Sequence, residues 1–142
     1  MRLIIPVGWT IARLGELVQI VMGQAPPGKD CNTDGIGTVF VKAGEFGPQY
    51  PLTREWTTKP LKLARRGDVL ICVVGATCGK LNLAIEAAIG RSVAAFRPGS
   101  GLITRFLWYQ LMVISQLQFK KVTIKLDKLW AKPGIMPNYL IF

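Results

Sequence analysis

The sequence predicts an α+β protein in which a curled, mainly antiparallel β-sheet packs around one core helix. Three short apolar segments bounded by turn residues lie close together at 69–74, 81–84 and 92–97. Strands joined by such short connections pair antiparallel, because a parallel pair needs a crossover of a dozen or more residues. One longer apolar segment, 106–119, holds no glycine or proline and is predicted to be the helix. With 142 residues, half of them hydrophobic, the chain can form one domain with a core.

The first part of the chain is predicted to contain two short strands separated by loops. Apolar residues in 9–22 recur at spacings that suit a short helix or turn leading into a strand around 18–22. Pro26 and Pro27 place the next residues in a loop, since proline lacks a backbone donor and disfavours helix before it. A second short strand is predicted at 39–42, followed by a stretch rich in glycine and proline.

The second part of the chain holds the strands and the helix that define the fold class. The apolar run 69–74 follows a turn and has the length and composition of a buried strand. A tight turn at 75–80 joins it to the strand 81–84. Thr104 precedes the helix and is predicted to cap its N-terminus. Because apolar side chains cover nearly the whole circumference of the helix, it is predicted to pack on more than one side, in the sheet's core or against a partner chain.

The charge of the chain favours a polyanionic partner. There are 18 Lys and Arg residues against 8 Asp and Glu, which gives a formal net charge of +10. The basic residues are scattered, without the juxtamembrane block or basic amphipathic helix of a lipid-surface binder, so nucleic acid is favoured over membrane. A solvated basic surface with no partner is the alternative. No apolar stretch approaches the ~20 residues that span a bilayer and no export signal opens the sequence, which predicts a cytoplasmic protein.

The residue types that enzymes use most are missing or dispersed. The chain has no histidine, so a Ser-His or Cys-His nucleophile cannot form within it. Its cysteines lack the Cys-x-x-Cys spacing of zinc sites, and its carboxylates form no acidic motif. The glycine-rich segment 75–81 has neither the glycine spacing nor the Ser or Thr of a P-loop. The sequence therefore predicts a non-catalytic protein with no metal or cofactor, and a small basic nuclease is the least favoured alternative.

An ordered set of short motifs extends through most of the chain. Each motif is weak alone, and their order makes them specific. In chain order they are Trp9 with Leu14-Gly15, the Gly23 to Gly28 loop, Thr57-Thr58-Lys59-Pro60, Gly67-Asp68-Val69-Leu70-Ile71, Gly75-Ala76 with Gly79-Lys80-Leu81-Asn82, Ile89-Gly90-Arg91 and Phe96-Arg97-Pro98. Over roughly 9–119 this order resembles the target recognition domain of the specificity subunits of type I restriction-modification systems.

The resemblance implies a target recognition domain, residues 1–121, that reads DNA and does no chemistry itself. Family members carry two such domains separated by long helices, and each domain recognises one half of a split DNA site. Residues 122–142 match neither the second motif nor the Pro-Pro-Leu segment that follows the core helix in the family, so the chain resembles a single-domain or truncated form. This divergent tail has no usable periodicity and is predicted to be poorly ordered.

The leading hypothesis is sequence-specific binding of double-stranded DNA as the recognition module of a type I restriction-modification system. The resemblance implies that partner methyltransferase and restriction subunits carry out methylation and cleavage, and that a second specificity half-subunit can pair with the chain. The alternative hypothesis is a truncated interaction module or decoy, which binds the methyltransferase subunit through the hydrophobic helix without directing a target.

The stretch 49–66 supplies the main candidate DNA contacts. Base readout needs side chains with paired donors or acceptors, which Arg54 offers to guanine and Gln49 to adenine. Tyr50 and Trp56 could stack on a base or wedge into a groove, although Trp56 is equally suited to anchor the core. The candidate phosphate contacts are Lys59, Lys62, Arg65 and Arg66.

A second candidate patch comes from the first loop and the strand after it. Its members are Gln24, Lys29, Asn32 and Lys42. Two arginines near strand ends are instead expected to be structural, because surface arginines commonly pair with carboxylates. These are Arg91 and Arg97, with Glu86 or Asp68 as the partner.

Overall fold

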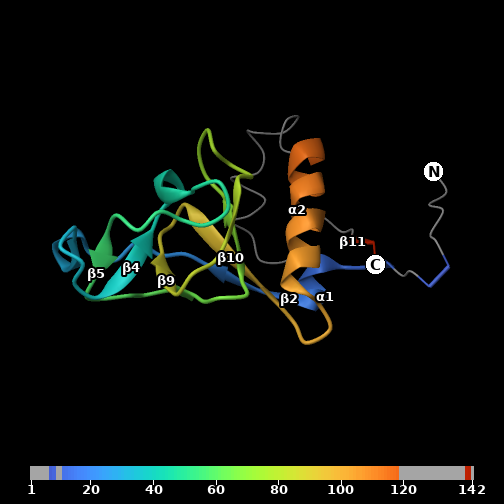
Figure 1. Cartoon of the computed structure of the whole chain (residues 1–142), viewed down its shortest axis with the longest axis horizontal. Helices are drawn as coiled ribbons and strands as arrows, with labels where there is room; N and C mark the ends of the chain where they lie inside the picture. Colours follow the sequence, from blue (N-terminus) through green and yellow to red (C-terminus); the bar gives the residue numbers. More distant parts are fainter. Residues whose placement is uncertain (1–6, 9–10, 119–139, 142) are drawn as a thin grey trace.

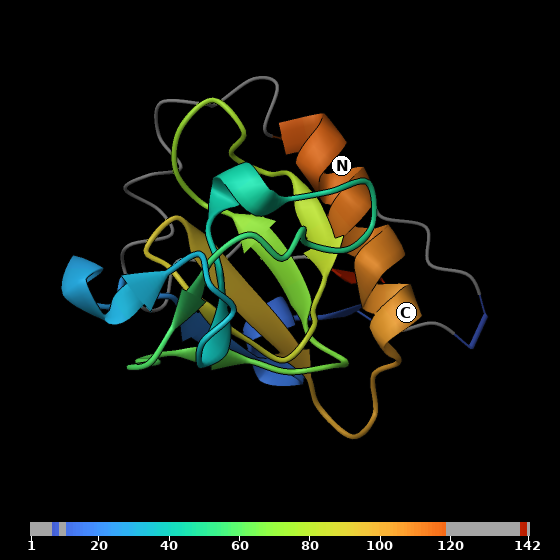
Figure 2. The same ribbon diagram turned by 60° about the vertical axis from the view of Figure 1, so that its left-hand side comes forward.

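The computed structural model of the chain describes residues 7–8, 11–118 and 140–141. It confirms the α+β class, with the strands divided between two larger sheets instead of forming a single one. In Figure 1, β4, β5 and β9 lie to the left of β10, and α2 stands on the right. Figure 2 shows the same arrangement from the side, with α2 upright beside the strands.

In the first sheet, every pair of neighbouring strands is antiparallel. Its strand order is β2 (Val18–Met22), β10 (Val93–Pro98), β7 (Val69–Cys72) and β8 (Leu81–Leu83). The short helix α1 (Leu14–Leu17) leads directly into β2, as the sequence predicts. The long helix α2 (Thr104–Gln118) packs against β7 and β8.

The second sheet is built from shorter strands and includes one parallel pair, β4 with β9. Its order is β3 (Cys31–Asn32), β5 (Trp56–Thr57), β4 (Thr38–Val41), β9 (Ala87–Ile89) and β6 (Leu63–Ala64). The 3-10 helices η1 (Gly28–Asp30) and η2 (Ala43–Glu45) lie in its connections. A further pair joins β1 (Ile11–Ala12) to β11 (Leu140–Ile141). Apart from 140–141, the tail 122–142 lies outside the described residues.

Two hydrophobic clusters, one on each face of the first sheet, form the core. Along β7, Val69 and Ile71 belong to the cluster beneath α2, whereas Leu70 and Cys72 belong to the cluster beneath the second sheet. This alternation follows the two-residue period of a strand. Because both faces are covered, β7 is apolar without interruption, which is why the sequence indicates a buried strand.

The predicted elements differ from the structure at three points. β7 ends at Cys72 instead of residue 74, because Val74 is exposed and the tight turn begins there. Thr104 is the first residue of α2, and its hydroxyl donates to the Gly67 carbonyl 2.8 Å away instead of standing before the helix as a cap. The described residues cover only part of the helix surface, since Tyr109 and Val113 are exposed; packing against a partner chain stays a prediction.

Gly23, where β2 passes into the first loop, permits a close approach of two backbones. A Cβ at this position would clash with the carbonyl oxygens of Gly90 and Val93. We predict that Gly23→Ala lowers the free energy of unfolding by about 1–3 kcal/mol, the usual cost of overpacking. Urea denaturation measures this, and Gly28→Ala is the control because its Cβ would meet nothing within 4 Å. Equal stability of the two variants would contradict the close backbone approach at Gly23.

Candidate nucleic-acid interface

We define the basic segment as residues 54–66, which run from the loop before β5 through β6 to the turn before β7. It carries five exposed cations and a single carboxylate. That carboxylate, Glu55, is paired with Lys42 at 2.5 Å. None of the five cations forms an ion pair with a carboxylate in the part of the chain that the structure describes. They are Arg54, Lys59, Lys62, Arg65 and Arg66.

The backbone of the basic segment is fixed to the second sheet at several points. The buried Thr57 hydroxyl donates to the Asp30 carbonyl at 3.0 Å, and the Thr58 N–H donates to the same oxygen at 2.9 Å. Further along, the Lys62 carbonyl accepts the Ile89 N–H at 2.9 Å. The main chain is therefore held while the ends of the long cationic side chains stay in solvent.

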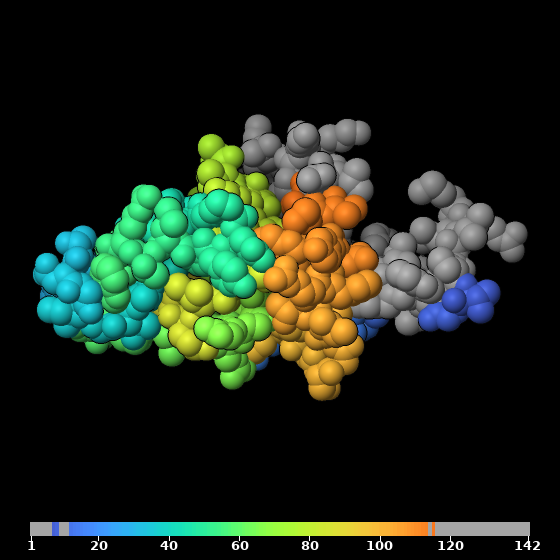
Figure 3. Space-filling view, in the orientation of Figure 1, coloured from blue at the N-terminus to red at the C-terminus, as the bar shows by residue number. Residues whose placement is uncertain are grey.

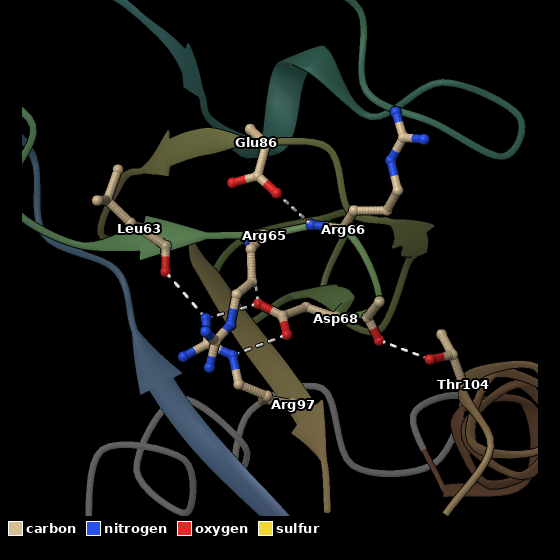
Figure 4. A network of polar contacts seen from close by, with 8 residues as sticks. Leu63, Arg65, Arg66, Asp68, Glu86, Arg97 and Thr104 are labelled. Carbon is tan, nitrogen blue, oxygen red and sulfur yellow. Dashed lines mark hydrogen bonds and ion pairs between the residues drawn. The ribbon is translucent and has the colours of Figure 1, made fainter.

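The turn Arg65–Asp68 is held by a polar network (Figure 4). The Arg65 N–H donates to the Asp68 carboxylate, and the Arg66 N–H donates to Glu86, each at 3.0 Å. Gly67 adopts a φ of +98°, which glycine tolerates without strain. Figure 4 shows the Arg66 guanidinium pointing away from the network, so its donors are available to a partner.

Asp68 is the centre of this network and is only 1% exposed. Arg97 of β10 donates two hydrogen bonds to its carboxylate, at 2.9 and 2.8 Å, and a third to the Leu63 carbonyl at 3.3 Å. The hydrogen-bonded Asp68 carboxylate raises the pKa of Arg97, which therefore stays charged. The predicted structural role of Arg97 is confirmed, with Asp68 as its partner. Arg91 is exposed and forms no ion pair among the described residues.

In the second candidate patch, some of the polar side chains are already bonded within the protein. The Asn32 amide donates to the Ile36 carbonyl at 2.8 Å and accepts two N–H groups of its own loop. Lys42 pairs with Glu55, and this hydrogen-bonded carboxylate raises the pKa of the lysine. Gln24 and Lys29 keep exposed side chains. The structure therefore leaves two of the four predicted side chains available for a partner.

Gln49 and Tyr50 lie on segment 46–52, which β8 holds in place. The buried Asn82 amide bonds both the N–H and the carbonyl of Gly47, and the Leu83 N–H donates to the Gln49 carbonyl at 2.7 Å. The Gln49 side chain is half-buried, whereas Tyr50 is exposed. Trp56 is half-buried in β5, between the two roles that the sequence allows.

Segment 46–52 lies beside α2 (Figure 3), and residues of both line a groove of about 610 Å³. Its walls include Phe46, Trp108 and Met112, and its cation, Lys80, donates to the Phe46 carbonyl at 3.0 Å. The described residues that line it include no carboxylate or cysteine, so they offer no acid-base pair. Across the described residues, no three metal-binding side chains meet in one place.

None of the helices in the described part of the chain has the length and apolar content to cross a bilayer.

The sequence does not reveal that Glu86 and Thr104 support the basic segment, because it predicts another role for each. Glu86 binds a backbone N–H 20 residues away, and Thr104 binds a carbonyl 37 residues away. Such contacts depend on the tertiary fold, and only the Gly67-Asp68 pair signals a turn at this place. Two exposed leucines within the basic segment, Leu61 and Leu63, are also absent from the predicted contacts.

Comparisons with known proteins place this geometry in a family. The model of the type I restriction modification DNA specificity domain matches residues 6–129. A protein of Methanocaldococcus jannaschii, assigned as the MjaX type I restriction enzyme specificity subunit, is 36% identical over 115 residues, covering 78% of this chain and 27% of the relative.

Solved structures give the same result. The HsdS subunit from Thermoanaerobacter tengcongensis matches with a TM-score of 0.82 and 34% identity, covering 99% of this chain and 34% of that chain. A structure from work on complex assembly and conformational transition of the type I R-M system matches with a TM-score of 0.83 and 35% identity, covering 99% and 35%. The chain thus spans about a third of the length of these relatives. It belongs to the family of type I restriction modification DNA specificity domains.

Proposed function

We propose that this chain is a DNA-recognition module, which binds double-stranded DNA with sequence preference and acts within a type I restriction-modification system. Family membership supports the system, and the basic segment carries the proposal of DNA binding. Its five exposed cations form no ion pair with a described carboxylate, so their charge is available to phosphates. Phosphate contacts supply most of the salt-dependent affinity of proteins for DNA.

Because the backbone of the basic segment is already anchored, its phosphate contacts cost less conformational entropy. Ordering a flexible loop on binding costs conformational entropy, and part of this cost is absent where the main chain is already fixed. Here Asp68 and Glu86 hold the backbone of Arg65 and Arg66, while Asp30 holds Thr58. Base readout is assigned to Arg54 and Gln49, which can pair with base edges, and to Tyr50 and Trp56, which can stack on a base or wedge into a groove. Gln24 and Lys29 form a second group of proposed contacts.

We assign the chemistry of the system to partner subunits. The chain has no histidine, and the described lining of the groove beside α2 has no carboxylate to act as a base. Methylation and cleavage then belong to a methyltransferase and a restriction subunit, and a second specificity half-subunit is a further proposed partner. The cytoplasm, where cellular DNA is accessible to such a complex, is the proposed location.

A second candidate function, association with a methyltransferase without target selection, is favoured by one observation. On α2, Tyr109 is 58% and Val113 57% exposed, which leaves an apolar face that the described residues do not cover. Co-purification with a methyltransferase subunit, combined with an unchanged set of methylated sites when the chain is deleted, would select this function. A change in the methylated sites selects recognition.

Removal of cations from the basic segment tests the DNA-binding proposal. We expect the triple variant Lys59→Ala, Lys62→Ala, Arg66→Ala to bind duplex DNA more weakly, with the slope of log affinity against log salt reduced by about 0.9 for each phosphate that the variant no longer neutralises. Fluorescence anisotropy over a salt series measures both quantities. Arg105→Ala, which removes an exposed arginine from α2, is the control and should leave the slope unchanged. A wild-type chain that does not bind duplex DNA at low salt would refute the proposal.

Asp68→Asn tests the network that supports the turn. The change leaves the Arg97 guanidinium without its carboxylate in a largely buried position, and loss of one partner of a buried pair usually costs 3–5 kcal/mol. Because the Arg97 side chain is 19% exposed, we expect a smaller loss in unfolding free energy, about 2–3 kcal/mol. Denaturant titration checks the value. Glu86→Gln keeps an oxygen for the Arg66 N–H at an exposed position, and its stability should stay near that of the wild type.

A further inference from the structure

The basic segment exposes two leucines between its cations. Leu61 is 38% and Leu63 is 52% exposed, and they alternate with the exposed Lys59, Lys62 and Arg65. An isolated exposed leucine needs no explanation, because much of any protein surface is apolar. Two leucines at alternating positions inside the most basic part of the described chain form a repeated pattern, which calls for a physical reason.

The fold places Leu63 outward in an edge strand. In β6, Ala64 is buried, so the strand's alternation turns Leu63 to the opposite side. β6 is the last strand in the order of the second sheet, and edge strands are normally protected by charged or polar residues. Figure 4 shows the Leu63 side chain pointing away from Arg97 and Asp68. The leucine side chain therefore contributes nothing to the polar network beneath it.

The surrounding charge indicates which partner covers these leucines. The centre of a protein–protein interface is depleted of charged residues, and lysine is depleted across such interfaces. Here each leucine has an exposed lysine next to it in the chain, and no described carboxylate neutralises this lysine. The partner must cover the leucines and also neutralise the neighbouring cations. A partner that is polyanionic outside and apolar inside does both. Duplex DNA has this chemistry, because phosphates border its grooves and stacked bases lie within them.

We propose that Leu61 and Leu63 are wedge residues, which press into the duplex at a base step and kink it while the neighbouring cations hold its phosphates. This inference rests on the proposed DNA-binding function and adds the mode of contact. Apolar wedges partly unstack a base step and bend the duplex. Pyrimidine–purine steps deform most easily, so the chain would prefer sites containing such a step at the wedge.

The double variant Leu61→Ala, Leu63→Ala tests the wedge. The probe is a duplex of about 30 base pairs that carries a sequence selected by the wild-type chain from a random pool, with donor and acceptor dyes at its ends. We expect about tenfold weaker binding for each leucine removed, on the order of 100-fold in total. The salt slope should stay unchanged because every cation is retained, and the shortened end-to-end distance of the bound duplex should return to that of free DNA.

Matched variants separate the wedge from a general loss of structure. Val113→Ala removes a comparable exposed aliphatic group from α2 and should leave affinity and bending at wild-type values. Leu63→Met, which keeps an apolar side chain of similar size, should retain most of the bend. Thermal unfolding of every variant confirms that the proteins are folded, as expected for substitutions at exposed positions.

The possible outcomes support or overturn the inference separately from the proposed function. Weaker binding with loss of the bend supports the wedge. Weaker binding without any bend in the wild-type complex overturns it, because the leucines would then only touch base edges such as thymine methyl groups. A double variant that binds and bends DNA like the wild type also overturns it and directs attention to a protein partner for the leucines. Absence of wild-type binding removes the proposed function and the wedge together.

Discussion

One buried carboxylate joins the separate layers of this domain. Asp68 receives two hydrogen bonds from Arg97, which belongs to the first sheet, and the same guanidinium reaches the Leu63 carbonyl in the second sheet. The residue before Asp68 accepts the hydroxyl of Thr104 at the start of α2. A buried carboxylate without these partners would be costly, so the two sheets and the helix have to meet at this point. The turn that carries Arg65 and Arg66 is placed by the same network.

The elements that could be predicted from the sequence are those with a clear pattern. β2 was identifiable because apolar residues end at the prolines of the first loop, and β7 because both of its faces are covered by other layers. The helix α2 was identifiable from its length without glycine or proline, but not its exposed face, since composition does not say how many neighbours a helix has. Four strands of the second sheet, β3, β5, β6 and β9, are two or three residues long, too short for any periodicity to show.

The candidate site was predictable in composition and not in geometry. A run of cations between turns indicates a polyanion, and the structure leaves all five of them exposed. Whether a polar side chain is free depends on partners that the local sequence does not name. The Asn32 amide bonds Ile36 within its own loop, and Lys42, just after β4, meets Glu55, just before β5. Such pairs depend on which groups the folded backbone brings within hydrogen-bond distance, and composition does not specify that.

The cations and the leucines of the basic segment act on DNA over different distances. At physiological salt, cations attract phosphates over about 8 Å, which brings a duplex to the surface whatever its sequence. An apolar wedge acts only in contact, and the energy it gains depends on how easily the base step beneath it opens. A wedge can therefore distinguish base steps only if the protein backbone that carries it does not move when the duplex binds. The Thr58 N–H donates to the Asp30 carbonyl and the Ile89 N–H to the Lys62 carbonyl, which holds the backbone on either side of Leu61, and Arg97 holds it at the Leu63 carbonyl.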